Sequence, residues 1–249
     1  MNTVICPETG KPQEYRPLVK GPNKPKWTRE FVNEIGRLFQ GIRDINVTNT
    51  CFSIHNNEVP KGSKVIYSRI VCNITPQKTK TCIVRLTVGG NKLSYRGPYY
   101  TPKADLTTSK LHCNSVLSTP DGKYFIVDVK KFYLNNPMNK AEYLKIALKI
   151  LPQDINDTYD LLSKKCDGYI YVRTEKGMYG LVQAGIIAHD KLKEHLNPYG
   201  YAPSNISQGL WTHIDRDINF TLVVDDFRIK YTHKKMRTTS SHPCRENMK

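Results

Sequence analysis

Two predicted strands of this 249-residue chain end in carboxylates, and their placement constrains the fold more than any other sequence feature. Asp128 interrupts the apolar segment KYFIVDV, and Asp225 and Asp226 end the run NFTLVV before a further strand begins. An Asp-Asp pair at such a reversal is commonly a polar hairpin turn. A lone Asp at the end of a buried strand, however, costs desolvation free energy unless it is paired or metal-bound.

If the two strands are neighbours, their carboxylates meet at one edge of the sheet and form a site for divalent cations, which prefer oxygen ligands. Strand side chains alternate between the two faces, so only one of Asp225 and Asp226 is expected to join Asp128, and we expect it to be Asp225. The strands should be antiparallel neighbours in a sheet with helices packed on one face.

Short strands and helices alternate along the chain without an internal repeat, which favours the α+β class over a doubly wound sheet. Apolar spacing predicts helices at residues 27–41, 106–120 and 186–200. Two β-branched runs at residues 65–74 and 81–90 flank the segment PQKTK and predict a hairpin. Residues 1–26 are expected to form an extended arm, and residues 232–249 a disordered basic tail.

The chain is strongly basic, with a formal net charge of +16 and a pI near 9.5. Residues 61–110 carry ten Lys and Arg against one acid, Asp105, so the tip and one face of the predicted hairpin are cationic. Such a hairpin is either a solvated surface that favours solubility or a binding site for phosphate oxygens, and the composition is compatible with both functions.

Other classes of protein are disfavoured by what the sequence lacks. The chain has no run of 18 apolar residues and no apolar signal-peptide core at its start, so neither a membrane partner nor secretion is expected. Its seven cysteines form no C-x-x-C pair, which argues against a zinc site or a disulfide framework and favours a reducing interior. We therefore expect an intracellular, cytoplasmic or nuclear, location.

Four segments in order resemble the reverse transcriptases of copia-type LTR retrotransposons. FIVDVKKFYLN resembles the family's D-V-K-x-x-F-L-N-G, KGMYGLVQAG resembles K-x-L-Y-G-L-K-Q-A, and VVDDF resembles Y-V-D-D. The stretch RLTVGGN resembles the fingers segment R-L-V-A-K-G. The similarity covers about residues 27–231 and implies a fingers-like region at 27–120, containing the basic hairpin, and a palm-like catalytic region at 121–231.

The resemblance implies an RNA-directed DNA polymerase that uses two-metal nucleotidyl transfer. Asp128, Asp225 and Asp226 are the expected catalytic residues, and Asp128 and Asp225 the ligands of two Mg²⁺ ions, which Mn²⁺ can replace. The implied partners are an RNA or DNA template-primer and deoxynucleotide triphosphates.

The same resemblance implies nucleotide contacts. Tyr133 corresponds to an aromatic residue that packs under the incoming sugar, although by itself it suggests an ordinary core aromatic. Gly180 and Gln183 lie in the second motif, whose glycine turn lets the backbone approach template and nucleotide, and a plain helix-start turn is the alternative. The remaining expected contacts, with the triphosphate, are Arg85, assisted by Lys78 or Lys80.

The chain also departs from the family pattern. Val223 stands where most relatives carry Tyr or Phe, and Val182 replaces the Lys or Pro before the Gln. The chain ends about twenty residues after Asp226, which leaves no room for a thumb or an RNase H domain. We therefore expect weak or no polymerase activity. The alternatives are a non-catalytic nucleic-acid-binding remnant of a retroelement polyprotein and a basic structural protein of an assembly.

Overall fold

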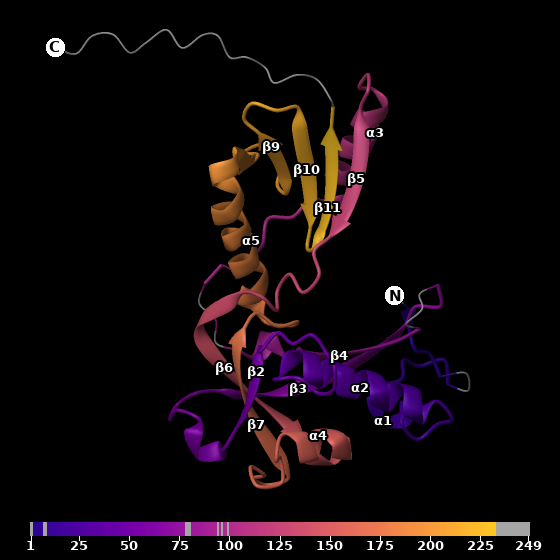
Figure 1. Ribbon diagram of the computed structural model, residues 1–249, viewed down its shortest axis with the longest axis vertical. Coiled ribbons are helices and arrows are strands. Elements are labelled where there is room, and N and C mark those ends of the chain that lie inside the picture. Colours follow the sequence, from indigo (N-terminus) through magenta and orange to yellow (C-terminus); the bar gives the residue numbers. More distant parts are fainter. Residues whose placement is uncertain are drawn as a thin grey trace, which may run out of the picture. The chain divides into compact units, whose positions relative to one another are not determined.

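The computed structural model describes residues 2–6, 9–77, 81–93, 95, 97, 98 and 100–232 (Figure 1). It shows a mixed α+β fold with two sheets and few helices, as predicted. The chain forms two compact units, each built from two segments: unit 1 contains residues 1–99 and 133–187, and unit 2 contains residues 100–132 and 188–249. The regions expected at 27–120 and 121–231 therefore each contribute residues to both units.

Unit 1 contains a six-stranded sheet with the order β1-β3-β6-β7-β2, in which β4 also pairs with β3. The predicted basic hairpin is confirmed, because β3 and β4 are antiparallel neighbours, whereas β3 and β6 are parallel. Lys78 and Lys80, in the connection of this hairpin, lie outside the described residues. The strands are β1 Asn2–Thr3, β2 Cys51–Ile54, β3 Val65–Ile74, β4 Cys82–Val88, β6 Pro137–Ala147 and β7 Tyr169–Lys176.

The helix predicted at residues 27–41 is confirmed as α2, which spans Lys24–Leu38. It begins earlier than expected because Pro25 occupies the first turn, where its fixed φ and missing N–H are tolerated. Its apolar residues, including Phe31, Ile35 and Leu38, are almost completely buried in the core of unit 1. The short helix α4, Gln153–Thr158, contacts α2 and adds Ile155 to the same core.

The N-terminal segment is not the extended arm that the sequence predicted. Residues Tyr15–Leu18 form the short helix α1, and Tyr15 is buried with its ring centroid 4.6 Å from that of Phe31. Removing Tyr15 and Leu18 from water offsets the entropy cost of ordering the segment. Polar and proline-rich composition therefore concealed two residues that belong to the core.

Unit 2 contains a five-stranded antiparallel sheet with the order β5-β11-β10-β9-β8. Helix α5 begins among the unit 1 residues, and from Ala188 onward its residues belong to unit 2. No helix in the described part of the chain has the length and apolar character needed to cross a bilayer. The elements are α3 Leu106–Leu117, β5 Lys123–Asp128, α5 Val182–Leu196, β8 Tyr201–Pro203, β9 Leu210–His213, β10 Ile218–Val223 and β11 Asp226–Tyr231.

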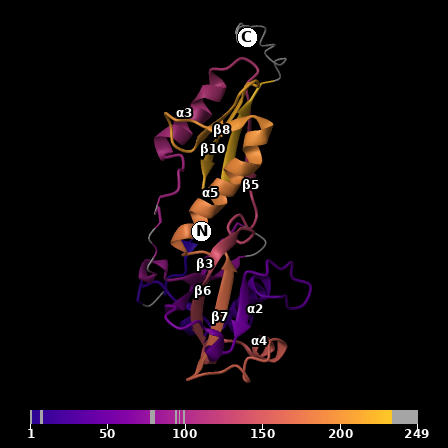
Figure 2. The ribbon, with the colours of Figure 1, turned by 90° about the vertical axis from the view of Figure 1, so that its left-hand side faces the viewer.

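Helices cover both faces of this sheet, and the prediction of helices on one face is wrong (Figure 2). Leu192 and Leu196 of α5 pack on the face that carries Trp211 and Phe220. On the opposite face, His112 of α3 shares a 2.8 Å hydrogen bond with Asn219. Lys230 of β11 donates to the Ser115 carbonyl of α3 at 3.1 Å. Because side chains alternate along β10 and β11, one face is apolar and binds α5, and the other is polar and holds α3 by hydrogen bonds.

Candidate metal centre and nucleotide-binding residues

The strands that carry the candidate metal ligands are antiparallel neighbours, as predicted. Asp128, the last residue of β5, lies directly opposite Asp226, the first residue of β11. In the β10–β11 hairpin Asp226 pairs with Val223, so the loop consists of two residues, Val224 and Asp225. The register therefore places all three acids at the same end of the sheet.

The structure brings both acids of the pair to Asp128, and the expectation that only Asp225 would join it is wrong. One carboxylate oxygen from each of Asp128, Asp225 and Asp226 lies within 4.8 Å of the other two. The alternation of faces applies to extended backbone. Asp225 lies in a tight turn, and the reversal of the chain there turns its side chain toward those of its neighbours.

The turn itself has an unusual backbone. Val224 has φ of 63°, a region that β-branched residues rarely adopt because of steric conflict with the backbone. The turn is tied to the chain after β5 by a hydrogen bond from the Val129 N–H to the Asp225 carbonyl, at 3.0 Å. Strained backbone of this kind is concentrated at functional sites, where the surrounding structure holds it in place.

The acids are accessible to solvent, which corrects one premise of the sequence argument. β5 is an edge strand and Asp128 is exposed, so no desolvation cost forces Asp128 to take a partner. A metal is favoured instead by the proximity of the acids, since three like charges within 4.8 Å repel one another. Carboxylate oxygens are the donors that Mg²⁺ and Mn²⁺ prefer, and these three acids fit such ions.

Two of the residues expected to bind nucleotide, Arg85 and Tyr133, contact the Tyr179 ring in unit 1. The Arg85 guanidinium carbon of β4 lies 4.7 Å from the centroid of the Tyr179 ring. Tyr133 meets the same ring edge-on, with centroids 6.0 Å apart. Among the described residues no carboxylate forms an ion pair with Arg85.

Gly180 follows Tyr179 and is a position where the turn requires glycine. Its φ is 92°, and a Cβ at this position would collide with the Val88 carbonyl. The close approach is fixed by a 2.9 Å hydrogen bond from the Val88 N–H to the Tyr179 carbonyl. The glycine thus allows the second motif to lie directly against the end of β4, which also carries Arg85.

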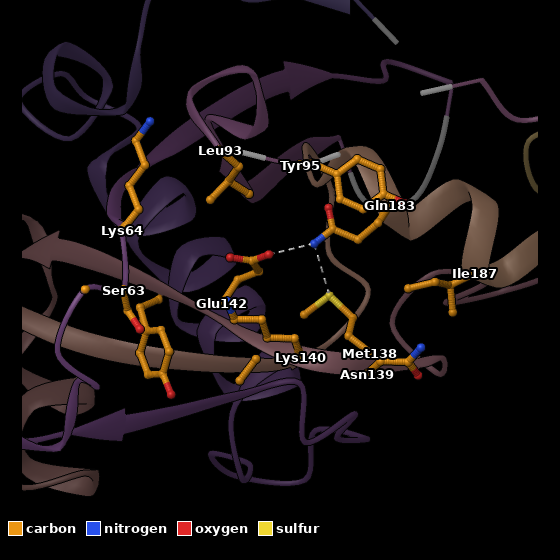
Figure 3. Close-up of a pocket in the computed structure, with 13 residues that line it drawn as sticks. Ser63, Lys64, Leu93, Tyr95, Met138, Asn139, Lys140, Glu142, Gln183 and Ile187 are labelled. Atoms are coloured by element: carbon orange, nitrogen blue, oxygen red, sulfur yellow. Dashed lines mark hydrogen bonds between the residues drawn. The ribbon is translucent and has the colours of Figure 1, made fainter. Parts of the chain in front are cut away.

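Gln183, in the first turn of α5, faces a pocket of about 420 Å³ in unit 1 (Figure 3). Its amide nitrogen donates to the Glu142 carboxylate at 2.9 Å, and its side chain is buried. Its amide oxygen has no hydrogen-bond partner in the described part of the chain. Burial raises the pKa of Glu142, and the hydrogen bond from Gln183 opposes that shift. The amide nitrogen of Gln183 is thus hydrogen-bonded to Glu142, whereas its amide oxygen has no partner among the described residues.

Sequence reasoning missed Tyr179 and Glu142. Tyr179 lies inside the second motif, and an aromatic residue next to a turn glycine was the available signal. Glu142 lies in β6, whose other inward residues, Leu144 and Ile146, are apolar. A single acid on the inner side of such a strand was the corresponding signal.

Comparison with known proteins does not assign the chain to a family. The scan against protein-family models gave no match, and the search of curated proteins gave none either. The function is therefore argued from the site itself.

Proposed function

We propose that the chain is the fingers and palm of an RNA-directed DNA polymerase, a reverse transcriptase of the copia retrotransposon type with weak activity. The observation that carries this proposal is the group of three carboxylates, Asp128, Asp225 and Asp226, at the ends of paired antiparallel strands. The group comes from two segments almost one hundred residues apart, and both belong to motifs that resemble the family's catalytic motifs.

Asp128 and Asp225 would hold two Mg²⁺ ions, with Asp226 adjacent and supporting, and Mn²⁺ would substitute. Bound ions of this kind supply activation of a primer 3′-hydroxyl and stabilisation of the negative charge that develops during in-line nucleotidyl transfer. The hairpin turn fixes the spacing of the three acids. Asp128 is exposed and Asp225 and Asp226 are partly exposed, which leaves coordination positions for phosphate oxygens and water.

The residues around Tyr179 would bind the deoxynucleotide triphosphate. A guanidinium offers five N–H donors in a planar fork that matches phosphate oxygens, and Tyr179 restricts the orientations of Arg85 by contact with its ring. Tyr133 would lie under the sugar, and the exposed Gly180 would let backbone approach the ligand. Gln183 would contribute the unpaired amide oxygen.

Metal-dependent primer extension tests the proposal. The assay uses a primed RNA or DNA template with Mg²⁺ or Mn²⁺ and reads incorporation of a single nucleotide, which does not require processive synthesis. Asp128→Asn and Asp225→Asn should abolish incorporation. Asp215→Asn removes an exposed acid from a turn of the same unit and should leave incorporation unchanged.

Two results would reject the proposal. Incorporation that survives Asp128→Asn would show that the three acids do not form the reaction site. Nucleic-acid binding without any incorporation, in conditions that keep the fold intact, would identify the chain as a non-catalytic nucleic-acid-binding protein.

A further inference from the structure

One face of the unit 1 sheet carries a concentration of aromatic and basic side chains. The residues that alternate with them, such as Leu144, Ile170 and Val172, are buried in the core. Successive strand residues point to opposite faces, so the partners of these core residues point away from it. The aromatic face, as we name it, consists of Phe52, Tyr67, Tyr143, Tyr169 and Tyr171 with Lys145 and Arg173.

Strand register places these side chains in adjacent rows. Lys145 of β6 lies between Tyr67 of β3 and Tyr171 of β7. In the next row Tyr143 and Arg173 are directly opposite each other, and Phe52 of β2 follows Arg173. The rows therefore run across four strands of one sheet.

The basic groups lie against the rings. The Lys145 ammonium is 4.5 Å from the centroid of the Tyr67 ring and 4.7 Å from that of Tyr169. The two rings are 5.9 Å apart in an edge-to-face arrangement. The Arg173 guanidinium carbon is 5.7 Å from the centroid of the Phe52 ring. Each contact is a favourable cation–π geometry.

This face is partly open to solvent. Tyr67 is 53 % exposed, and the Arg173 side chain, which pairs with the Glu175 carboxylate at 2.9 Å, is 40 % exposed. Figure 2 shows α2 and α4 together on one side of β6 and β7. These helices cover the core face, to which Phe31 and Ile155 belong. A set of aromatic rings therefore remains at the surface on the other face, where the hydrophobic effect would favour their burial by a partner.

The charge of the surroundings favours an anionic partner. Unit 1 contains 23 Lys and Arg against 12 Asp and Glu, a net charge of +11. A hydrogen bond with Tyr67 raises the pKa of Lys145, so the ammonium remains charged at neutral pH. The same bond to Lys145 lowers the pKa of Tyr67.

We propose that the aromatic face binds single-stranded nucleic acid, with bases stacked on its tyrosine rings and phosphates held by Lys145. Stacking on aromatic rings needs bases that are unpaired, which selects single strands over duplexes. Every base has a ring face to stack, so this surface accepts DNA and RNA of many sequences. The proposal stands apart from the metal site, because it uses no residue of unit 2.

Oligonucleotide binding in EDTA tests this surface without the metal site. Fluorescence anisotropy of labelled oligo(dT) and oligo(rU) is measured with the full chain at low salt. Tyr67→Ala and Tyr169→Ala should each weaken binding by ~5- to 150-fold, the range that one lost base stack produces. Tyr67→Phe keeps the ring and should bind within about 2-fold of the wild type on the same argument.

Two matched controls separate stacking from general effects. Tyr199→Ala removes another tyrosine, 64 % exposed, from unit 2 and should leave affinity unchanged. Asp215→Asn, at an exposed acid of unit 2, should also leave affinity in EDTA unchanged. Absence of primer extension by the wild-type chain, with oligonucleotide binding intact, would reject only the polymerase proposal. Extension by Tyr67→Ala together with unchanged oligonucleotide binding would reject only the aromatic face.

Photocross-linking covers the case in which an alanine variant fails to fold. An oligonucleotide carrying 5-iodouridine is irradiated with the wild-type chain, and adducts are located by mass spectrometry. Adducts at Tyr67, Tyr169 or Tyr171 would support the proposal. Adducts confined to other segments, equal affinity for a blunt duplex, or no binding at low salt would overturn it.

Discussion

Replacing Asp128 by Asn should have opposite effects on stability in the absence and presence of a divalent cation. Two unit charges 4.8 Å apart in water repel by about 0.9 kcal/mol, and screening at physiological salt reduces this to about 0.5 kcal/mol. Asp128 faces two such neighbours, so neutralising it should relieve ~1 kcal/mol of repulsion. In EDTA we therefore expect Asp128→Asn to be more stable than the wild type.

A bound cation should reverse that order. At a concentration ten times its dissociation constant, a ligand of the native state adds about 1.4 kcal/mol of stability. Mn²⁺ should stabilise the wild type by that amount and the variant far less. Chemical denaturation with and without Mn²⁺ measures both effects.

The control is Asp215→Asn, which removes an exposed acid from a turn in unit 2 and should respond to Mn²⁺ like the wild type. The reasoning is refuted if Asp128→Asn is destabilised in EDTA. It is also refuted if the variant gains as much stability from Mn²⁺ as the wild type.

Three further predictions concern other groups. Val224→Gly should relieve backbone strain of ~1–2 kcal/mol, partly offset by the conformational entropy that glycine loses on folding. The melting temperature of unit 2 should therefore rise, and an unchanged or lower melting temperature in calorimetry would contradict this prediction. Burial raises the pKa of the Cys51 thiol to about 12, so in native protein at pH 8 the exposed Cys113 should be alkylated and Cys51 should not, as mass mapping would show. Because burial raises the pKa of Glu142 in the folded state, its favourable contribution to stability is complete below the unfolded pKa and is lost as the pH rises through the folded pKa. Glu142→Gln should therefore gain stability relative to the wild type as the pH rises from about 4 to neutral, and a constant difference in urea titrations would exclude this.

Local patterns in the sequence were enough to predict much of the secondary structure. The spacing of Phe31, Ile35 and Leu38 gave α2, and the β-branched runs gave the β3–β4 hairpin. These signals are local because helix and strand periodicities repeat within a few residues. The pairing of the strands that carry Asp128 and Asp226 was also expected, although only because both strands ended in acids.

The details of the candidate site were decided by turns and long-range packing. Val224 and Asp225 form a two-residue turn, and this geometry, unlike strand alternation, brings both acids of the pair to Asp128. Likewise, the partner of Gln183 is Glu142, 41 residues earlier in the chain. No local period encodes a contact across such a separation.

The aromatic face shows most clearly the difference between what the local sequence predicts and what long-range packing decides. Each of Tyr67, Lys145 and Tyr169 is an ordinary strand residue in the sequence, and alternation alone determines which side of its strand it occupies. The parallel pairing of β3 with β6 and the antiparallel pairing of β6 with β7 decide that the three lie together. Side-chain chemistry is therefore a property of the sequence, whereas its concentration on one surface results from strand register, which the buried neighbours fix through packing of the core.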